Sequence, residues 1–180
     1  MTTEQIVAQH YTHGSLEAAL LDGLRRSGKN ADRIDPDDLA PGDEFHIGGR
    51  QATVEFADQL GLRPGLELLD IGSGIGGPAR YFAHHRQCRV TGIDLTDEYV
   101  RVASALSERT VLAGNLKFVQ GSALALPFPP ASFDGAYILH AVRRLSGRRH
   151  DQARLRHGHQ GAAAEAVSNA QRPIQWFGPT

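Results

Sequence analysis

A carboxylate followed by a cluster of glycines is the part of this sequence best suited to chemistry. Asp70 lies in the stretch LELLDIGSGIGGPAR (66–80), and the glycines that follow it are Gly72, Gly74, Gly76 and Gly77. Glycine lets the backbone approach a ligand closely, and the free N–H groups at the start of a helix attract a negatively charged group. The spacing Gly72-x-Gly74-x-x-Gly77 fits the dinucleotide fingerprint, so the turn is a candidate nucleotide site.

The position of Asp70 favours a ligand that also carries positive charge. A carboxylate directly before the turn repels a pyrophosphate at short range, whereas it attracts an ammonium or sulfonium group. A second acid, Asp94, follows the turn at about the 20-residue distance at which a carboxylate meets ribose hydroxyls. Asp94 therefore indicates a nucleoside ligand of either kind. An NAD-type site and a tight turn without any ligand are the alternatives.

These residues need a parallel sheet whose strands all end at one edge, where ligands bind in open α/β sheets. The apolar run at 66–71, interrupted only by Glu67, predicts a central strand buried on both faces. Three further strands are predicted at 88–93, 116–120 and 133–139. Helices are predicted at 16–26, at 50–60, from the glycine turn to about His85, and from an N-cap at Thr96.

The run Asp-x-Gly-x-Gly-x-Gly at 70–76 closely resembles the first motif of the class I S-adenosylmethionine-dependent methyltransferases. Ser132-Phe133-Asp134 resembles the motif that leads into their fourth strand, and the likeness covers about residues 10–141. The resemblance implies an α/β fold, with a Rossmann-like sheet and an N-terminal helical cap. It also implies S-adenosyl-L-methionine as cofactor and methyl transfer to an O, N or C nucleophile of a small-molecule acceptor.

The resemblance implies roles for particular residues. Asp70 would hold the amino group of the cofactor and Asp94 its ribose, while the glycine turn would form a backbone cradle. Ser122 stands where the family commonly has an acid that reaches the adenine amino group, and a serine can still hydrogen-bond adenine. The full cofactor-binding set is Asp70, Gly72, Ser73, Gly74, Gly76, Asp94, Leu95, Ser122 and Ala123.

Two histidines are the candidate catalytic residues. His140 closes the predicted fourth strand, where it could act as a base or orient the acceptor; the alternative is a helix N-terminal histidine that only supports the site. His46 lies in the segment FHIGGR (45–50) before a helix and could contact the substrate; the alternative is a turn with surface side chains. The acids at 35–44 are interpreted as a solvated connector. His84 and His85 are interpreted as residues that complement the helix dipole, because adjacent helical positions diverge in direction.

The chain divides into a helical cap (1–50), a cofactor-binding half (51–142) and a basic tail (143–180). The tail has seven arginines and two acids, lacks an apolar run of strand length, and is predicted to be poorly ordered. A reading-frame shift or a truncation near residue 142 would explain the break. The fourth strand would then be an exposed apolar edge, which predicts self-association through it, partial disorder or poor solubility. A nucleic-acid contact and a metal cluster of His150, His157 and His159 are less favoured interpretations of the tail.

Overall composition narrows the function classes. The net charge of the 180 residues is −1, which indicates neither a nucleic-acid nor a membrane partner. Cys88 is the only cysteine, so a disulfide within the chain and a cysteine-based metal site are excluded, and a cytoplasmic location is expected. No signal peptide, membrane span or metal site is predicted. A catalytically inactive, cofactor-binding remnant is the rival to an enzyme.

Overall fold

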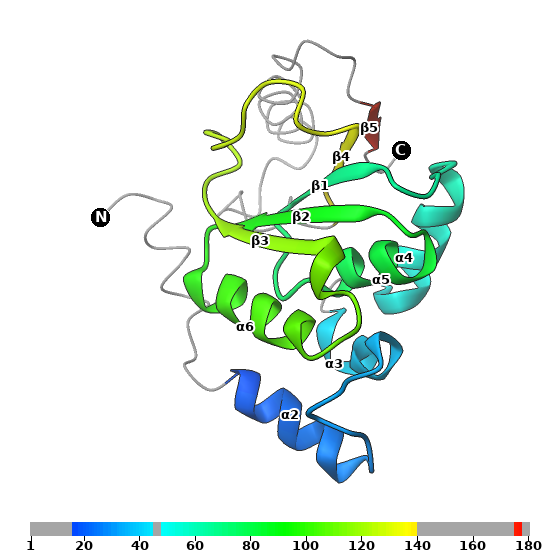
Figure 1. The fold of residues 1–180 in the computed structure, drawn as a ribbon, viewed down its shortest axis with the longest axis vertical. Coiled ribbons are helices and arrows are strands. Elements are labelled where there is room, and N and C mark those ends of the chain that lie inside the picture. Colours follow the sequence, from blue (N-terminus) through cyan, green and yellow to red (C-terminus); the bar gives the residue numbers. More distant parts are fainter. Residues whose placement is uncertain (1–15, 45–47, 140–174, 178–180) are drawn as a thin grey trace, which may run out of the picture.

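The computed structural model describes residues 16–44, 48–139 and 175–177, and every structural statement below concerns these residues. A parallel sheet of five strands, in the order β3-β2-β1-β4-β5, forms the centre of the fold (Figure 1). The strands are β1 (Glu67–Ile71), β2 (Arg89–Asp94), β3 (Leu116–Gln120), β4 (Gly135–Tyr137) and β5 (Gln175–Phe177). The chain order therefore reverses beside β1, and open α/β sheets bind ligands at such a switch point.

Helices cover one face of the sheet, and a smaller group of helices packs beyond them (Figure 1). The first group is α4 (Gly49–Gln59), α5 (Gly77–His85) and α6 (Asp97–Glu108). The second group is the cap, with α2 (Leu16–Arg26), the short 3-10 helix η1 (Pro36–Leu39) and α3 (Ala40–Asp43). A further 3-10 turn, η2 (Ala113–Asn115), precedes β3. Right-handed crossovers from β1 to β2 and from β2 to β3 place α5 and α6 on the same face.

Three buried clusters hold these layers together. Between the sheet and α4 and α5 lie Leu68, Phe82 and Tyr137 with their neighbours. On the opposite sheet face, Ile71 and the other buried strand residues pack against Phe128 and Phe133, which belong to the connection between β3 and β4. The third cluster joins α2 to α6, so the cap shares a core with the sheet domain.

The Rossmann-like sheet and the helical segment before it are confirmed. The first three strands and the four helices lie within a residue or two of their predicted bounds, except that α6 ends at Glu108, before Gly114. β4 is shorter than the predicted strand at 133–139. No helix among the described residues has the length and apolar character needed to cross a membrane.

The expectation of a free edge on β4 is wrong. β5 pairs with β4 in parallel register, with Ala136 opposite Trp176 and Tyr137 opposite Phe177. The tail has no apolar run of strand length, but three residues, of which two are aromatic, are enough to add a short strand. The physical basis for self-association through the β4 edge is therefore removed. Residues 143–174 of the tail lie outside the described part of the chain.

Candidate functional site

The glycine turn is a left-handed backbone segment that is hydrogen-bonded to the neighbouring strand β2. Gly72, Gly74 and Gly76 have φ angles of +74°, +54° and +83°, in the left-handed region that glycine adopts at little cost. The N–H groups of Gly72 and Ser73 both donate to the Ile93 carbonyl, at 2.8 and 3.1 Å. The turn thus keeps its shape through the end of β2, so ligand-facing groups are fixed before any ligand arrives.

The glycines of the turn differ in what occupies the space beside their Cα atoms. A Cβ atom on Gly74 would meet no heavy atom within 4 Å, so the turn is open to a ligand at that residue. A Cβ atom on Gly76 would come within 2.6 Å of the Phe118 ring, and one on Gly77 would clash with the backbone carbonyl of Asp43. Gly74 therefore leaves room for a ligand, whereas Gly76 and Gly77 leave room for the protein itself.

Asp94 connects the ends of β1 and β2. Its Oδ2 accepts the Gly74 N–H at 2.9 Å, and its Oδ1 accepts the Thr96 N–H at 2.9 Å. Thr96 occupies the predicted N-cap of α6, but its side chain makes no capping bond. Each carboxylate oxygen has a second lone pair, so Asp94 can hold the turn and still accept hydrogen bonds from a ligand.

Asp70 lies deeper than its neighbours in the site. It is 1% exposed, and its register neighbour in β4 is Tyr137, which is fully buried. Both side chains lie on the sheet face that carries α4 and α5, because residues two apart in a strand share a face and Leu68 packs there. Burial, together with the charge and hydrogen bonding of Asp70, raises the pKa of the Tyr137 hydroxyl well above its ordinary value. Tyr137 was missed because a sequence does not reveal which strands pair.

The end of β3 completes this edge of the sheet. The Gly121 N–H donates to the Asp94 carbonyl at 2.9 Å, and the Gln120 side chain donates to the Leu95 carbonyl at 3.2 Å. Ser122 follows, and its hydroxyl accepts the Leu124 N–H at 3.1 Å. The structure therefore brings the predicted residues of all three strand ends to one edge. His46 and His140 lie outside the described residues, so their catalytic roles stay predictions.

A buried arginine on α5 holds the glycine turn against the cap. Its role was not predicted from the sequence. Arg80 on α5 is 0% exposed, and its Nε and Nη2 donate to Oδ2 of Asp43 at 3.1 and 3.0 Å. Nη2 also donates to the Ile75 carbonyl within the glycine turn, and Nη1 donates to the Ser107 hydroxyl on α6 at 3.0 Å. One side chain thus joins the cap, the turn and α6.

The interpretation of the acids at 35–44 as a solvated connector is wrong for the last two. Asp43 and Glu44 are 3% and 9% exposed. The Glu44 carboxylate accepts the Thr53 hydroxyl at 2.8 Å and lies 3.4 Å from the Arg50 guanidinium. The only local signal was the density of charge, and the partner of Asp43 lies 37 residues away in the chain.

Fold and geometry together define a Rossmann-like domain in which the glycine turn and the acidic strand ends meet at the carboxyl edge of the sheet. In a comparison with known families, the family described as "Methyltransferase domain" matches residues 68–157, which is half of the chain. The chain belongs to this methyltransferase domain family, and the resemblance to class I S-adenosylmethionine-dependent methyltransferases is confirmed. The match also extends beyond residue 141, where the sequence analysis ended the resemblance.

The curated relatives include sterol C-methyltransferases and O-methyltransferases. Sterol 24-C-methyltransferase ERG6B of Gibberella zeae is 40% identical over 87 residues, which is 48% of this chain and 23% of that protein. An O-methyltransferase of Pyrenophora dematioidea is 29% identical over 148 residues, covering 82% of this chain and 54% of that protein. The chain therefore spans about a quarter of the sterol enzyme and about half of the O-methyltransferase.

Solved structures share the fold. An S-adenosylmethionine-dependent methyltransferase from Thiobacillus denitrificans, in complex with S-adenosylhomocysteine, has a TM-score of 0.55 at 22% identity. The match covers 75% of this chain and 52% of that one. The [4+2]-cyclase SpnF has a TM-score of 0.55 at 25% identity and covers 79% of this chain and 50% of its own. The same fold thus occurs in a protein named for a different reaction.

Proposed function

We propose that this chain binds S-adenosyl-L-methionine and serves methyl transfer to a small-molecule acceptor. The observation that carries the proposal is the Asp94 carboxylate, bonded to the Gly74 N–H where the glycine turn is open. This arrangement offers acceptors for ribose hydroxyls beside a backbone that a ligand can approach. Membership of the family supports the proposal, as do relatives named as sterol and O-methyltransferases.

The residues at the sheet edge fit such a cofactor. Asp94 would accept the ribose hydroxyls, and Leu95, Ser122 and Ala123 would border the adenine. Gly72, Ser73, Gly74 and Gly76 would form the cradle. Asp70 would supply negative charge for the amino group, with Tyr137 holding its carboxylate in place. When bound, S-adenosyl-L-methionine supplies a sulfonium methyl group for in-line attack by an acceptor atom.

For the acceptor side we propose His140 and His46. In the sequence, His140 directly follows the last described residue after β4, and His46 precedes α4 by three residues. A histidine there would orient the acceptor, or take its proton where the nucleophile is protonated. We further propose the division into a cap (1–50), a cofactor-binding half (51–142) and a tail (143–180), in a cytoplasmic protein without nucleic-acid or membrane partners.

A second candidate is cofactor binding without turnover. The match to the sterol methyltransferase covers 23% of that protein, so the comparison supports cofactor binding by a shared domain more directly than the activity of the whole enzyme. NAD-type binding is a lesser candidate, based on the spacing of the glycines alone.

Two measurements on the full chain separate these functions. Isothermal titration with S-adenosyl-L-methionine, S-adenosylhomocysteine and NAD⁺ identifies the ligand class, and a methyl-release assay with sterol and phenolic acceptors then tests turnover. We expect Asp94→Ala to lose S-adenosyl-L-methionine binding, whereas Asp97→Ala keeps it. Asp97 is a matched control because it lies three residues further on, is 60% exposed and pairs only with Arg101 among the interactions described for it. Preference for NAD⁺, or no binding of either nucleoside, would contradict the proposal.

A further inference from the structure

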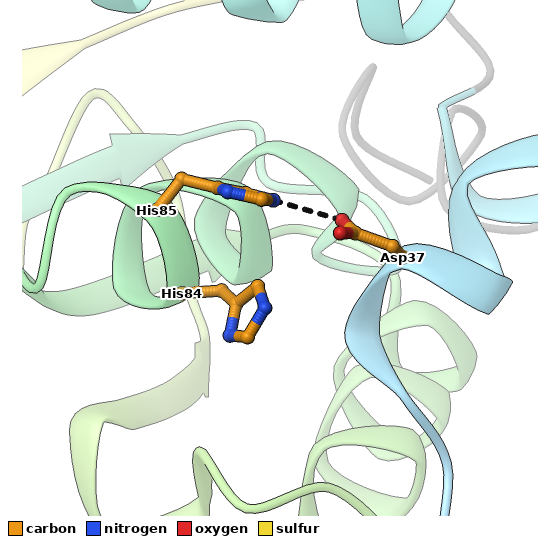
Figure 2. Close-up of side chains that lie close together, drawn as sticks. All are labelled: Asp37, His84 and His85. Atoms are coloured by element: carbon orange, nitrogen blue, oxygen red, sulfur yellow. Dashed lines mark hydrogen bonds and ion pairs between the residues drawn. The ribbon is translucent and has the colours of Figure 1, made fainter.

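Two histidines and an aspartate converge on the surface away from the sheet edge. His84 and His85 are the last two residues of α5, and Asp37 belongs to η1 in the cap. One ligand atom of each side chain lies within 4.8 Å of those of the other two. Figure 2 shows both imidazole rings projecting from the end of α5 on the side from which Asp37 approaches. His85 Nε2 lies 2.9 Å from Asp37 Oδ1.

Adjacent positions on a helix predict that the two imidazoles diverge, and the structure differs. Their ring centroids are 4.6 Å apart, with the rings nearly perpendicular. Adjacent Cβ atoms on a helix do point in different directions, but an imidazole extends far enough to turn back toward a shared neighbour. Asp37, which lies 48 residues before His85 in the chain, is that neighbour.

Packing and hydrogen bonds hold the backbone of the Asp37 segment and the ring of His85. Asp35 caps η1 by accepting the Asp37 N–H at 3.0 Å, and Pro36 and Leu39 on either side of Asp37 are buried. The His85 ring lies 4.6 Å from the ring of Tyr81, tilted by 33°. His85 and Asp37 remain accessible, with side chains 36% and 50% exposed. Because the backbone is fixed on both sides, only side-chain rotation is needed to bring the three ligand atoms to an ion.

We propose that Asp37, His84 and His85 form a site for a divalent transition-metal ion of the Zn²⁺ and Ni²⁺ class. Imidazole nitrogen and carboxylate oxygen are ligands of these ions, and three protein ligands leave further positions for water. In a tetrahedral site with bonds of about 2.0–2.1 Å the ligand atoms lie roughly 3.4 Å apart, so no pair has to close by more than about 1.4 Å. Exposed side chains close such a distance by rotation.

Arg50 is the cation that competes for this site. Its guanidinium lies 3.6 Å from Asp37 Oδ1, and also 3.4 Å from the Glu44 carboxylate. An ion bound at Asp37 displaces Arg50 from that oxygen, and Glu44 retains the arginine. The ion would tie the cap to α5, the helix that starts at the glycine turn. Since the three ligands meet only in the folded chain, binding raises its stability.

The test titrates the full chain with Zn²⁺ and Ni²⁺ alone, by calorimetry and by thermal unfolding. The background is a chain in which His150, His157 and His159 are replaced by Gln, because tail histidines could also bind metal. We expect one ion per chain, a higher melting temperature with Zn²⁺, and at least tenfold weaker binding in His84→Ala, His85→Ala and Asp37→Asn. Asp38→Asn is the matched control, since Asp38 is adjacent, carries the same charge and pairs with Lys29.

Spectroscopy gives a second readout that does not depend on stability. Cu²⁺ bound to the background chain should show two coordinating nitrogens by electron paramagnetic resonance, and His84→Ala should show one. The proposal is overturned if no ion binds at 100-fold excess over the chain. It is also overturned if binding persists unchanged in the His84→Ala/Asp37→Asn double variant, or if Asp38→Asn weakens it as much as Asp37→Asn does.

Discussion

Removing the carboxylate of Asp43 should substantially lower the free energy of unfolding of this protein. Arg80 is 0% exposed, and two of its donors reach the same Asp43 oxygen at 3.1 and 3.0 Å. Asp43→Ala leaves the guanidinium buried without its counter-charge. Loss of one partner from a buried pair costs about 3–5 kcal/mol. A domain of this size is stable by roughly 5–15 kcal/mol, so the variant should lose between about a fifth and all of its stability.

The structure also predicts how related variants rank. Asp43→Asn keeps an oxygen acceptor but loses the charge, so we expect it to lower the free energy of unfolding by about 1.5–3 kcal/mol. The double variant Asp43→Leu/Arg80→Met removes both charges and fills similar volume, and it should lose less than Asp43→Ala. Asp38→Ala is the control, because its ion pair with Lys29 lies at the surface and should contribute under about 1 kcal/mol.

Urea unfolding, followed by far-UV circular dichroism, measures these differences. Arg80 also donates to the Ile75 carbonyl in the glycine turn, so the Asp43 variants should bind S-adenosyl-L-methionine more weakly even at temperatures where they are folded. An Asp43→Ala variant within about 1 kcal/mol of the wild type would refute the reasoning, since a buried, unpaired guanidinium cannot cost so little. It would mean that Arg80 reaches water or another acid in solution.

Three further predictions concern the site and the core. Asp94→Asn keeps one acceptor but sets an amide donor against Gly74 N–H or Thr96 N–H, so titration should show at least tenfold weaker S-adenosyl-L-methionine binding with a smaller change in urea midpoint. Gly74→Ala should cost about 1–2 kcal/mol from its positive φ, and Gly76→Ala more, because the ring of Phe118 is in its way; equal urea midpoints would contradict this. Burial, opposed by Arg86, raises the pKa of the Cys88 thiol to about 11. The unfolded chain therefore releases this proton first, and stability should fall between about pH 9 and 11 by on the order of 2 kcal/mol more in the wild type than in Cys88→Ala.

The parts of the site that lie close together in sequence were predicted. The glycine turn, the strand before it and Asp94 at the end of the next strand are local patterns, because strand periodicity and turn chemistry act over a few residues. Parallel pairing then requires that the carboxyl ends of β1, β2 and β3 meet. The same reasoning predicted α2, α4 and α5 from apolar stripes and their end signals.

What only the tertiary structure decided are pairings between distant residues. Asp43 and Arg80, 37 residues apart, form a buried ion pair inside a segment that resembles a solvated loop in sequence. Tyr137 lies beside Asp70 because β4 pairs with β1. β5 pairs with the other edge of β4, although β5 is only three residues long and belongs to a polar tail. Local composition reports how a segment interacts with water and with its own backbone. Local composition does not specify which distant residue replaces that water. That distant partner determines whether an acid or a histidine is a surface group or part of a site.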